Sequence, residues 1–276
     1  MSVHSGKFGA INGEASIRDW SISDVSVLPA NVVSGSKFGR VRNPGVRSWS
    51  GNYNQLLAEP SILPGEVGTG KFFTAPTNDV DGAAGFTYNG AFLVTAAAIA
   101  WDWTAGAHLS SALTFIGDGP LTIVSEIVTD ASIPAPLEVC GTKIEYSAAG
   151  AVWTELANIA QATLNLSCDA QSYVNSSTGC WTGQKAGPLD WNASITLQDN
   201  IRTGPVIGTN YQWKFWVDDT YFWLLKWGIV KDYSGITVNV ETGAIITQTL
   251  NLEMNGVVGG VVGIVTSPSD VDWFGA

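Results

Sequence analysis

The sequence contains an approximate internal repeat, with an offset of about half its 276 residues. Segments 15–17, 45–49, 71–73 and 105–119 match 157–159, 187–191, 214–216 and 242–256, in the same order and at a nearly constant offset. Matches that keep their order and spacing favour a duplicated unit; the alternative is chance similarity between two Gly-rich halves. The repeat predicts two similar domains, residues 1–130 and 138–276, joined by a polar stretch that contains Pro134 and Pro136.

Apolar and polar residues alternate in the second half, which is the pattern of half-buried β-strands. The alternating segments are 162–169, 191–198, 236–241 and 250–254. The aromatic stretch 211–227 predicts a hairpin that turns at Asp218-Asp219. Residues 54–59 predict a short helix before Pro60, and residues 198–203 are a weaker helix candidate. The predicted fold is all-β: two tandem β-sandwich domains, each with a long projecting arm and at most one short helix.

The amino-acid composition excludes further classes of protein. Charged residues make up 13% of the chain, about half the usual share, while hydrophobic residues make up 45%. This composition excludes intrinsic disorder and a helical bundle, and it suggests that much of the surface is buried against other copies. The net charge of −11 argues against sequence-specific DNA binding, because phosphate contacts need lysine and arginine.

The residues that usually carry catalysis are scarce. His4 and His108 are the only histidines, and the three cysteines form no CxxC pair. Asp218-Asp219 could form a metal or acid–base pair, but a hairpin turn is favoured. Residues 65–72 are interpreted as a turn that enters a strand, and the twelve tryptophans as core rather than a sugar-stacking platform. We therefore assign no catalytic, cofactor-binding or metal residue, and an enzyme is the least favoured class.

Two long stretches, 28–46 and 169–189, show no alternation and occupy corresponding positions in the halves. Loops of this length are usually functional or ordered by a partner, so both are predicted to be projecting hairpins or arms. The first holds or adjoins a group of cations: Lys37, Arg40, Arg42 and Arg47. In so acidic a chain, these cations are predicted to be subunit-interface residues that dock on an acidic neighbour; contact with nucleic acid is the less favoured alternative.

These features resemble the major tail tube proteins of tailed bacteriophages. Segments 109–122 and 250–257 resemble the alternating strand and turn that close a tail-tube domain. Segment 45–53 is similar to that family's strand entry, and segment 11–17 fits its opening. The resemblance covers most of the chain and occurs twice, once in each half. Typical family members supply one domain per chain.

The resemblance implies rings that stack into a tube through which DNA leaves the capsid. Two domains per chain imply three chains per ring with pseudo-sixfold symmetry, and arms that reach the adjacent ring. Expected partners are further copies of the chain, a tape measure, a terminator, a baseplate, possibly a sheath, and genomic DNA in transit without tight binding. The expected location is the virion tail after synthesis in the host cytoplasm, because no signal pattern or long apolar run is present. The runner-up function is a carbohydrate-binding β-sandwich of a virion fibre or baseplate.

Overall fold

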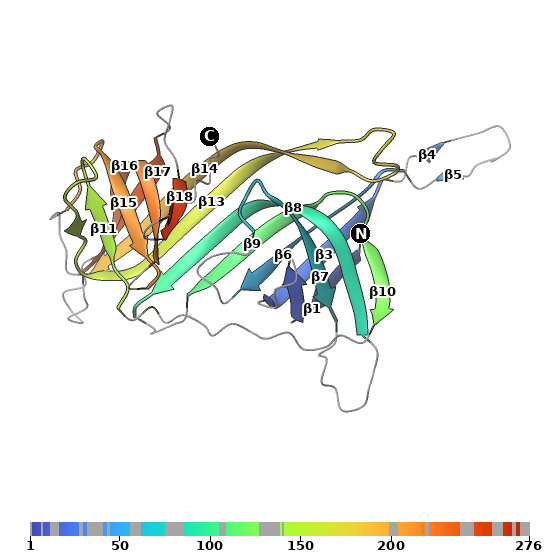
Figure 1. Cartoon of the computed structure of the whole chain (residues 1–276), viewed down its shortest axis with the longest axis horizontal. Coiled ribbons are helices and arrows are strands. Elements are labelled where there is room, and N and C mark those ends of the chain that lie inside the picture. The colour runs from blue at the N-terminus through green and yellow to red at the C-terminus, as the bar shows by residue number, and fades with distance from the viewer. Residues whose placement is uncertain are drawn as a thin grey trace.

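The chain folds as an all-β protein in a computed structural model (Figure 1). The structure describes residues 2–6, 8–11, 17–27, 30–31, 41–42, 45–55, 62–74, 85–104, 109–126, 139, 141–198, 204–218, 221–237, 246–255, 262–266 and 269–270. No helix occurs among these residues, and seventeen strands form one antiparallel sheet.

Nineteen strands follow one another along the chain. Those of the first half are β1 (Ser2–Gly6), β2 (Phe8–Ile11), β3 (Ile17–Ser26), β4 (Ala30–Asn31), β5 (Val41–Arg42), β6 (Arg47–Gln55), β7 (Val67–Phe73), β8 (Gly85–Asp102), β9 (Ser110–Gly117) and β10 (Thr122–Glu126). Those of the second half are β11 (Ile144–Ser147), β12 (Thr154–Glu155), β13 (Ile159–Tyr173), β14 (Gly183–Gln198), β15 (Asn210–Trp216), β16 (Tyr221–Thr237), β17 (Thr247–Met254), β18 (Val262–Thr266) and β19 (Ser269–Asp270).

The second half repeats the strand pairings of the first. In the first half, β3 pairs with β6, β6 with β9, β9 with β8, and β8 also with β7 and β10. In the second half, β13, β14, β17, β16, β15 and β18 pair in the corresponding order. The outer pair β2–β7 has its counterpart in β11–β15.

Irregularities of the ladder repeat as well. The ladder shifts register after Ile17 in β3 and, at the equivalent point of the repeat, after Ile159 in β13. It shifts again after Val94 in β8 and after Val230 in β16. Because β-bulges bend a strand at a fixed point, shared bulges mean that the two halves bend in the same places.

Strands β8 and β16 each run through both layers of a sandwich. The first part of β8 pairs with β7 and β10, whereas its second part pairs with β9 and, beyond the halves' boundary, with β13. The first part of β16 likewise pairs with β15 and β18, and its second part with β17. One layer is therefore continuous through the molecule, in the order β3-β6-β9-β8-β13-β14-β17-β16.

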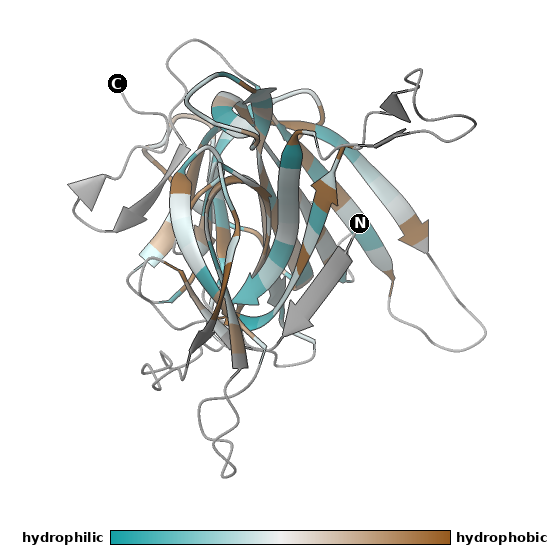
Figure 2. Cartoon of the chain, turned by 90° about the vertical axis from the view of Figure 1, so that its right-hand side faces the viewer, coloured by the Kyte–Doolittle hydropathy of each residue, from teal (hydrophilic) through white to brown (hydrophobic). Residues whose placement is uncertain are grey.

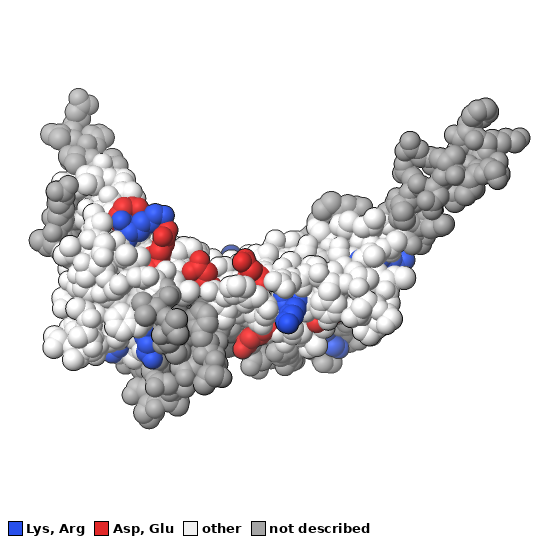
Figure 3. Space-filling view, turned by 90° about the horizontal axis from the view of Figure 1, so that it is seen from above, with Lys and Arg blue, Asp and Glu red and all other residues white. Residues whose placement is uncertain are grey.

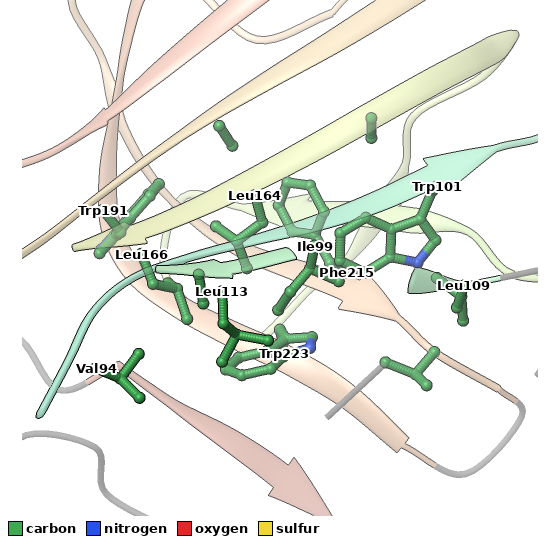
Figure 4. Close-up of a cluster of buried hydrophobic side chains, with 14 of the residues drawn as sticks. Val94, Ile99, Trp101, Leu109, Leu113, Leu164, Leu166, Trp191, Phe215 and Trp223 are labelled. Carbon is green, nitrogen blue, oxygen red and sulfur yellow. The ribbon is translucent and has the colours of Figure 1, made fainter. Parts of the chain in front are cut away.

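The core is one apolar cluster that spans both halves. In Figure 4, Ile99 of β8 and Leu164 of β13 lie among Leu113, Trp191, Phe215 and Trp223 from both halves. Six tryptophans are almost completely buried: Trp20, Trp49, Trp101, Trp191, Trp213 and Trp223. This agrees with the expected core role of the tryptophans. Figure 2 shows hydrophilic and hydrophobic bands along the strands, as the period-two pattern predicts.

One sequence-based expectation needs correction. Asn54 and Gln55, placed in a short helix, belong to β6, where Gln55 pairs with Ile17; residues 56–60 lie outside the described residues. The stretch 169–189 is a hairpin, as predicted, because β13 and β14 continue their ladder through Tyr173↔Gly183. It shows no hydropathy alternation because most of its side chains are exposed, as the residues from Gln171 to Ser177 all are.

The first arm is also a hairpin at its described positions. At its base the Val27 amide donates to the Val46 carbonyl and the Gly45 amide donates to the Val27 carbonyl, and β4 pairs with β5 farther out. The predicted turn at Asp218 is confirmed, since Asp218 Oδ1 accepts a hydrogen bond from the Tyr221 amide at 2.6 Å. Gly65, at a φ of +91°, lies in the turn that enters β7, as expected.

Candidate assembly interface

A backbone ladder joins the two halves. Residues Ala96–Asp102 of β8 pair with Ser167–Gln161 of β13 in antiparallel register. The ladder is reinforced where β8 ends, since the Trp103 amide donates to the Ala160 carbonyl at 3.0 Å. Beside it, Gln161 Nε2 donates to Asp102 Oδ2 at 3.1 Å. Main-chain pairing of this kind joins one sheet to another through backbone hydrogen bonds, which do not require particular side chains.

One face of this junction is fully apolar. Ala97, Ile99 and Trp101 of β8 lie opposite Leu166, Leu164 and Ala162 of β13, and all six are at most 2% exposed. Trp101 also reaches into the second half, where its Nε1 donates to the Trp216 carbonyl at 3.0 Å. The junction thus combines edge pairing with a shared core, which makes it a stable template for joining two such units.

The first half has an edge that corresponds to the β13 side of the junction. Trp20–Asp24 of β3 correspond to Ala162–Leu166 of β13, because their partners Tyr53–Trp49 and Ile195–Trp191 are related by the same repeat offset. At this edge β13 pairs with β8, whereas β3 pairs with β1. Ser2–Gly6 of β1 pair with Asp24–Trp20, in the register that Ala97–Trp101 take on β13.

The second half has an edge that corresponds to the β8 side. After its bulge, β16 pairs with β17 from Asp232 to Ser234, as β8 pairs with β9 from Ala96 to Ala98; a second register shift, which β8 does not share, precedes the pair Thr237↔Thr247. On the opposite side of this part of β16, no strand of the described chain is paired. Ile236 lies here with 48% of its surface exposed, whereas the corresponding part of β8 holds Ile99, which is completely buried.

The continuous layer has a polar face opposite its core. Cross-strand hydrogen bonds on it join Ser21 to Asn52, Asn165 to Asn192, and Asn251 to Asp232, at 3.0, 2.9 and 2.7 Å. The carboxylates on this face are Asp19, Asp102, Asp190, Asp232 and Glu253, and Lys231 pairs with Glu253. The face is therefore neutral to acidic. Figure 3 shows the described part of the molecule as a curved body, hollowed along one side, with few charged groups.

The second arm covers the polar face of the first half. Its Trp181–Thr182 backbone pairs with Arg47, and the Gln184 amide donates to Asp118 Oδ1 at 2.8 Å. Between arm and sheet lies a hollow of about 670 Å³ lined mainly by Ser, Thr and Asn. The family resemblance implied that this arm reaches an adjacent ring, but these contacts place it on the first half of its own chain.

Asn255 corresponds to Asp118 in the second half. The Asp118 amide donates to the Ala91 carbonyl at 2.8 Å, and the Asn255 amide donates to the Trp227 carbonyl at 2.9 Å. Asp118 receives the second arm, whereas Asn255 Nδ2 donates to Asn210 at 2.9 Å. The position that binds the second arm in the first half is therefore bonded within its own domain in the second half.

The predicted interface cations lie in different surroundings. Lys37 and Arg40 lie outside the described residues, and Arg42 is described only as part of β5. Arg47 is exposed, with its guanidinium 5.7 Å from the ring centroid of Trp181. Arg47 therefore has a partner within the chain. The sequence patterns did not identify the edges of β3 and β16; only their pairing does.

Charged groups also gather on the outer layer of the second half. Glu145 accepts hydrogen bonds from Lys143 Nζ at 2.8 Å and from Trp216 Nε1 at 2.9 Å. Burial raises the pKa of Glu145, but these hydrogen bonds and the charges of Lys143 and Lys214 outweigh it and hold the pKa below its usual value. Lys214 lies over Trp153 and Phe222, 4.2 and 4.5 Å from the ring centroids. This cluster stabilises the outer layer.

Nothing in the described part of the chain points to a reaction centre. No group of three His, Cys, Asp or Glu residues among the described positions is arranged to hold a metal ion. His108 lies outside the described residues, and His4 is in β1. No helix in the described part of the chain is long and apolar enough to cross a membrane.

Comparison with known proteins finds no matching family model and no matching curated protein. The functional argument therefore depends on the geometry of the sheet edges and of the polar face.

Proposed function

We propose that the protein is a self-assembling structural subunit in which the β8–β13 junction is repeated between chains. The β16 edge of one copy pairs with the β3 edge of the next, as β8 pairs with β13 within the chain. One observation supports this proposal: the strand order repeats, but the junction forms only once within the chain, between β8 and β13. The corresponding edge of β16 has no strand partner among the described residues.

The proposed assembly is a tube built of stacked rings, in keeping with the family resemblance. Each chain supplies two tail-tube-like domains, so three chains close a ring with six similar junctions. The polar face of the continuous layer lines the bore, with the second arm lying over part of this face in the first half. Its carboxylates and amides suit a conduit for DNA, because a neutral to acidic surface does not bind phosphates tightly. In this account the protein acts in the virion tail, without a cofactor, and is not an enzyme.

Electron microscopy of the purified protein over a range of concentrations tests this proposal. We expect rings and open-ended stacks above a threshold concentration. Discrete monomers at all concentrations would contradict it, and so would tight binding of DNA by the assembled particles at physiological salt.

A charge on the open edge should stop assembly selectively. Lysine at an exposed strand edge blocks edge-to-edge pairing, so Ile236→Lys is expected to keep the monomer folded and abolish rings. Val152→Lys is the matched control, because Val152 is 78% exposed and lies outside both edges. If both variants assemble equally well, the β16 edge is not an interface.

The polar hollow beneath the second arm favours one other function, the binding of a carbohydrate. Hydroxyl and amide groups suit sugar hydroxyls, but every tryptophan in the described ranges is buried or half-buried rather than exposed as a stacking platform. Glycan-array binding by a protein that forms no open-ended particles would favour this alternative.

A further inference from the structure

The N-terminal strand β1 occupies the edge of β3 that the proposed assembly requires. Ser2–Gly6 pair with Asp24–Trp20, the positions that correspond to Leu166–Ala162 in the internal junction. A strand edge can hold one partner strand at a time. A neighbouring β16 therefore cannot join β3 in the manner of the internal junction while β1 is in place.

We propose that β1 is a removable cover of this edge, which the β16 strand of a second copy displaces during assembly. This inference rests on the proposed self-assembly. It adds a regulatory step: the free subunit protects its own coupling edge, and assembly proceeds by exchange of one strand for another.

The sequence of β1 suits a temporary partner. By register, Ser2, His4 and Gly6 take the positions that Ala97, Ile99 and Trp101 hold on β13. Those three β8 residues are all buried, and apolar burial is what stabilises a strand on a sheet beyond its backbone pairing. β1 replaces a large aromatic residue by glycine, so it supplies the backbone pairing with far less apolar area.

The β16 strand of a second copy has more apolar side-chain surface to bury on β3 than β1 has. Tyr233 corresponds to Ala97, because its partner Leu250 corresponds to Leu113. Ile236 lies within the second register shift of β16, between Ser234 and Thr237, next to the position that corresponds to Ile99. Ile236 is half-exposed in the free chain. Exchange would therefore bury apolar surface that is exposed before assembly, whereas the strand released is mostly polar or small.

Equivalence of the junctions favours exchange over insertion. If β1 stayed in place and β16 paired with its outer side, junctions between chains would contain one more strand than the junction within the chain. That arrangement would separate neighbouring chains by an additional strand spacing of about 4.8 Å. Exchange makes the junctions alike.

Deletion of residues 2–6 is the first test. We expect the critical concentration for assembly, measured by light scattering and microscopy, to fall about tenfold, since a difference of about 1.4 kcal/mol corresponds to that factor. An unchanged or higher critical concentration would overturn the inference, because a strand inserted between chains would be needed for assembly rather than opposed to it.

A reversible lock is the second test. Val3 and Ser23 are directly opposite, so Val3→Cys with Ser23→Cys, in a background with Cys140, Cys168 and Cys180 replaced by alanine, can tie β1 to β3. The oxidised protein should remain monomeric and should assemble on reduction. Assembly of the cysteine-free parent should not change when reductant is added.

The outcomes separate the two proposals. If the parent assembles and the oxidised disulfide variant, its disulfide verified by mass spectrometry, assembles equally well, the strand exchange is excluded. The proposed function would not be affected by that result. If neither the parent nor the deletion variant assembles, both proposals fail. Assembly of the deletion variant alone would support both.

Discussion

Trp49 of β6 and Trp191 of β14 occupy equivalent positions in the two halves. Each is at most 1% exposed, and their cross-strand partners, Asp24 and Leu166, are equivalent in the repeat as well. Both indole rings are packed against glycine: a Cβ at Gly117 would lie 2.1 Å from Trp49 Nε1, and one at Gly228 would lie 2.5 Å from Trp191 Cη2. The two glycines lie on different strands and are not equivalent, so the repeat extends to the burial of these two tryptophans but not to the residues that enclose them.

This packing predicts that Gly117→Ala and Gly228→Ala both destabilise the protein. Each methyl group overlaps an indole ring enclosed by core, so a loss of about 1–3 kcal/mol in the free energy of unfolding is expected for each. Gly141→Ala is a useful comparison, because nothing lies within 4 Å of its Cβ and only its φ of +92° opposes the change. Chemical denaturation measures all three; equal effects would mean that the indole contacts are not tight.

Asp118 is expected to hold the second arm on the first half. Asp118→Ala removes the acceptor of the Gln184 amide, so the arm should separate more often and expose Lys185 to trypsin. We expect several-fold faster cleavage at Lys185 under native conditions. Glu155→Ala, an exposed carboxylate far from the arm, should cleave at the parent rate. If Asp118→Ala also cleaves at that rate, the side chain does not hold the arm.

Glu145 should make stability depend on acid pH. Its pKa is lower in the folded than in the unfolded chain, so its contribution is complete above the unfolded value of 4.5 and is lost as the pH falls through the folded value. Glu145→Gln should therefore cost about 1 kcal/mol at pH 7 and progressively less below pH 4.5. Urea unfolding across this pH range, with the exposed Glu155→Gln as control, checks the effect. A pH-independent difference would exclude the ionic contribution.

The cations of the first arm should matter for assembly rather than for folding. Replacing Lys37, Arg40 and Arg42 by serine is expected to leave the unfolding transition unchanged and to shorten or abolish stacks. Single surface ion pairs contribute only about 0.2–1 kcal/mol, but many repeated contacts act together in a polymer. Arg47→Ser should act differently, through the second arm, because Arg47 lies against Trp181. Stacks of normal length and yield from the triple variant would rule out the predicted role.

Local sequence patterns predicted the all-β class, the buried tryptophans and the turn at Asp218, because alternation and turn chemistry are local properties. They failed at residues 54 and 55, where helix-favouring neighbours suggested a helix but pairing with Ile17 and Asp19 keeps the chain extended. They also missed the junction. No local pattern identifies the strand that Ala96–Asp102 pair with, because that choice depends on the folded arrangement.

The second arm was predicted as a projecting hairpin, but its strands were not. Most of its residues are exposed, so nothing in their hydropathy marks the strands, although the ladder from Ala170 to Tyr173 is regular. The sequence likewise does not show which side of β16 has no neighbouring strand among the described residues.

Cryo-electron microscopy of the assembled particle tests the central claim most directly. The account predicts that the segment from Tyr233 to Thr237 of each chain pairs antiparallel with the segment from Asp24 to Ser21 of the next. It also predicts that β1 has left β3, and that the polar face with Asn192 and Glu253 lines the bore. Particles joined through other surfaces, or a bore lined mainly by lysine and arginine, would contradict it.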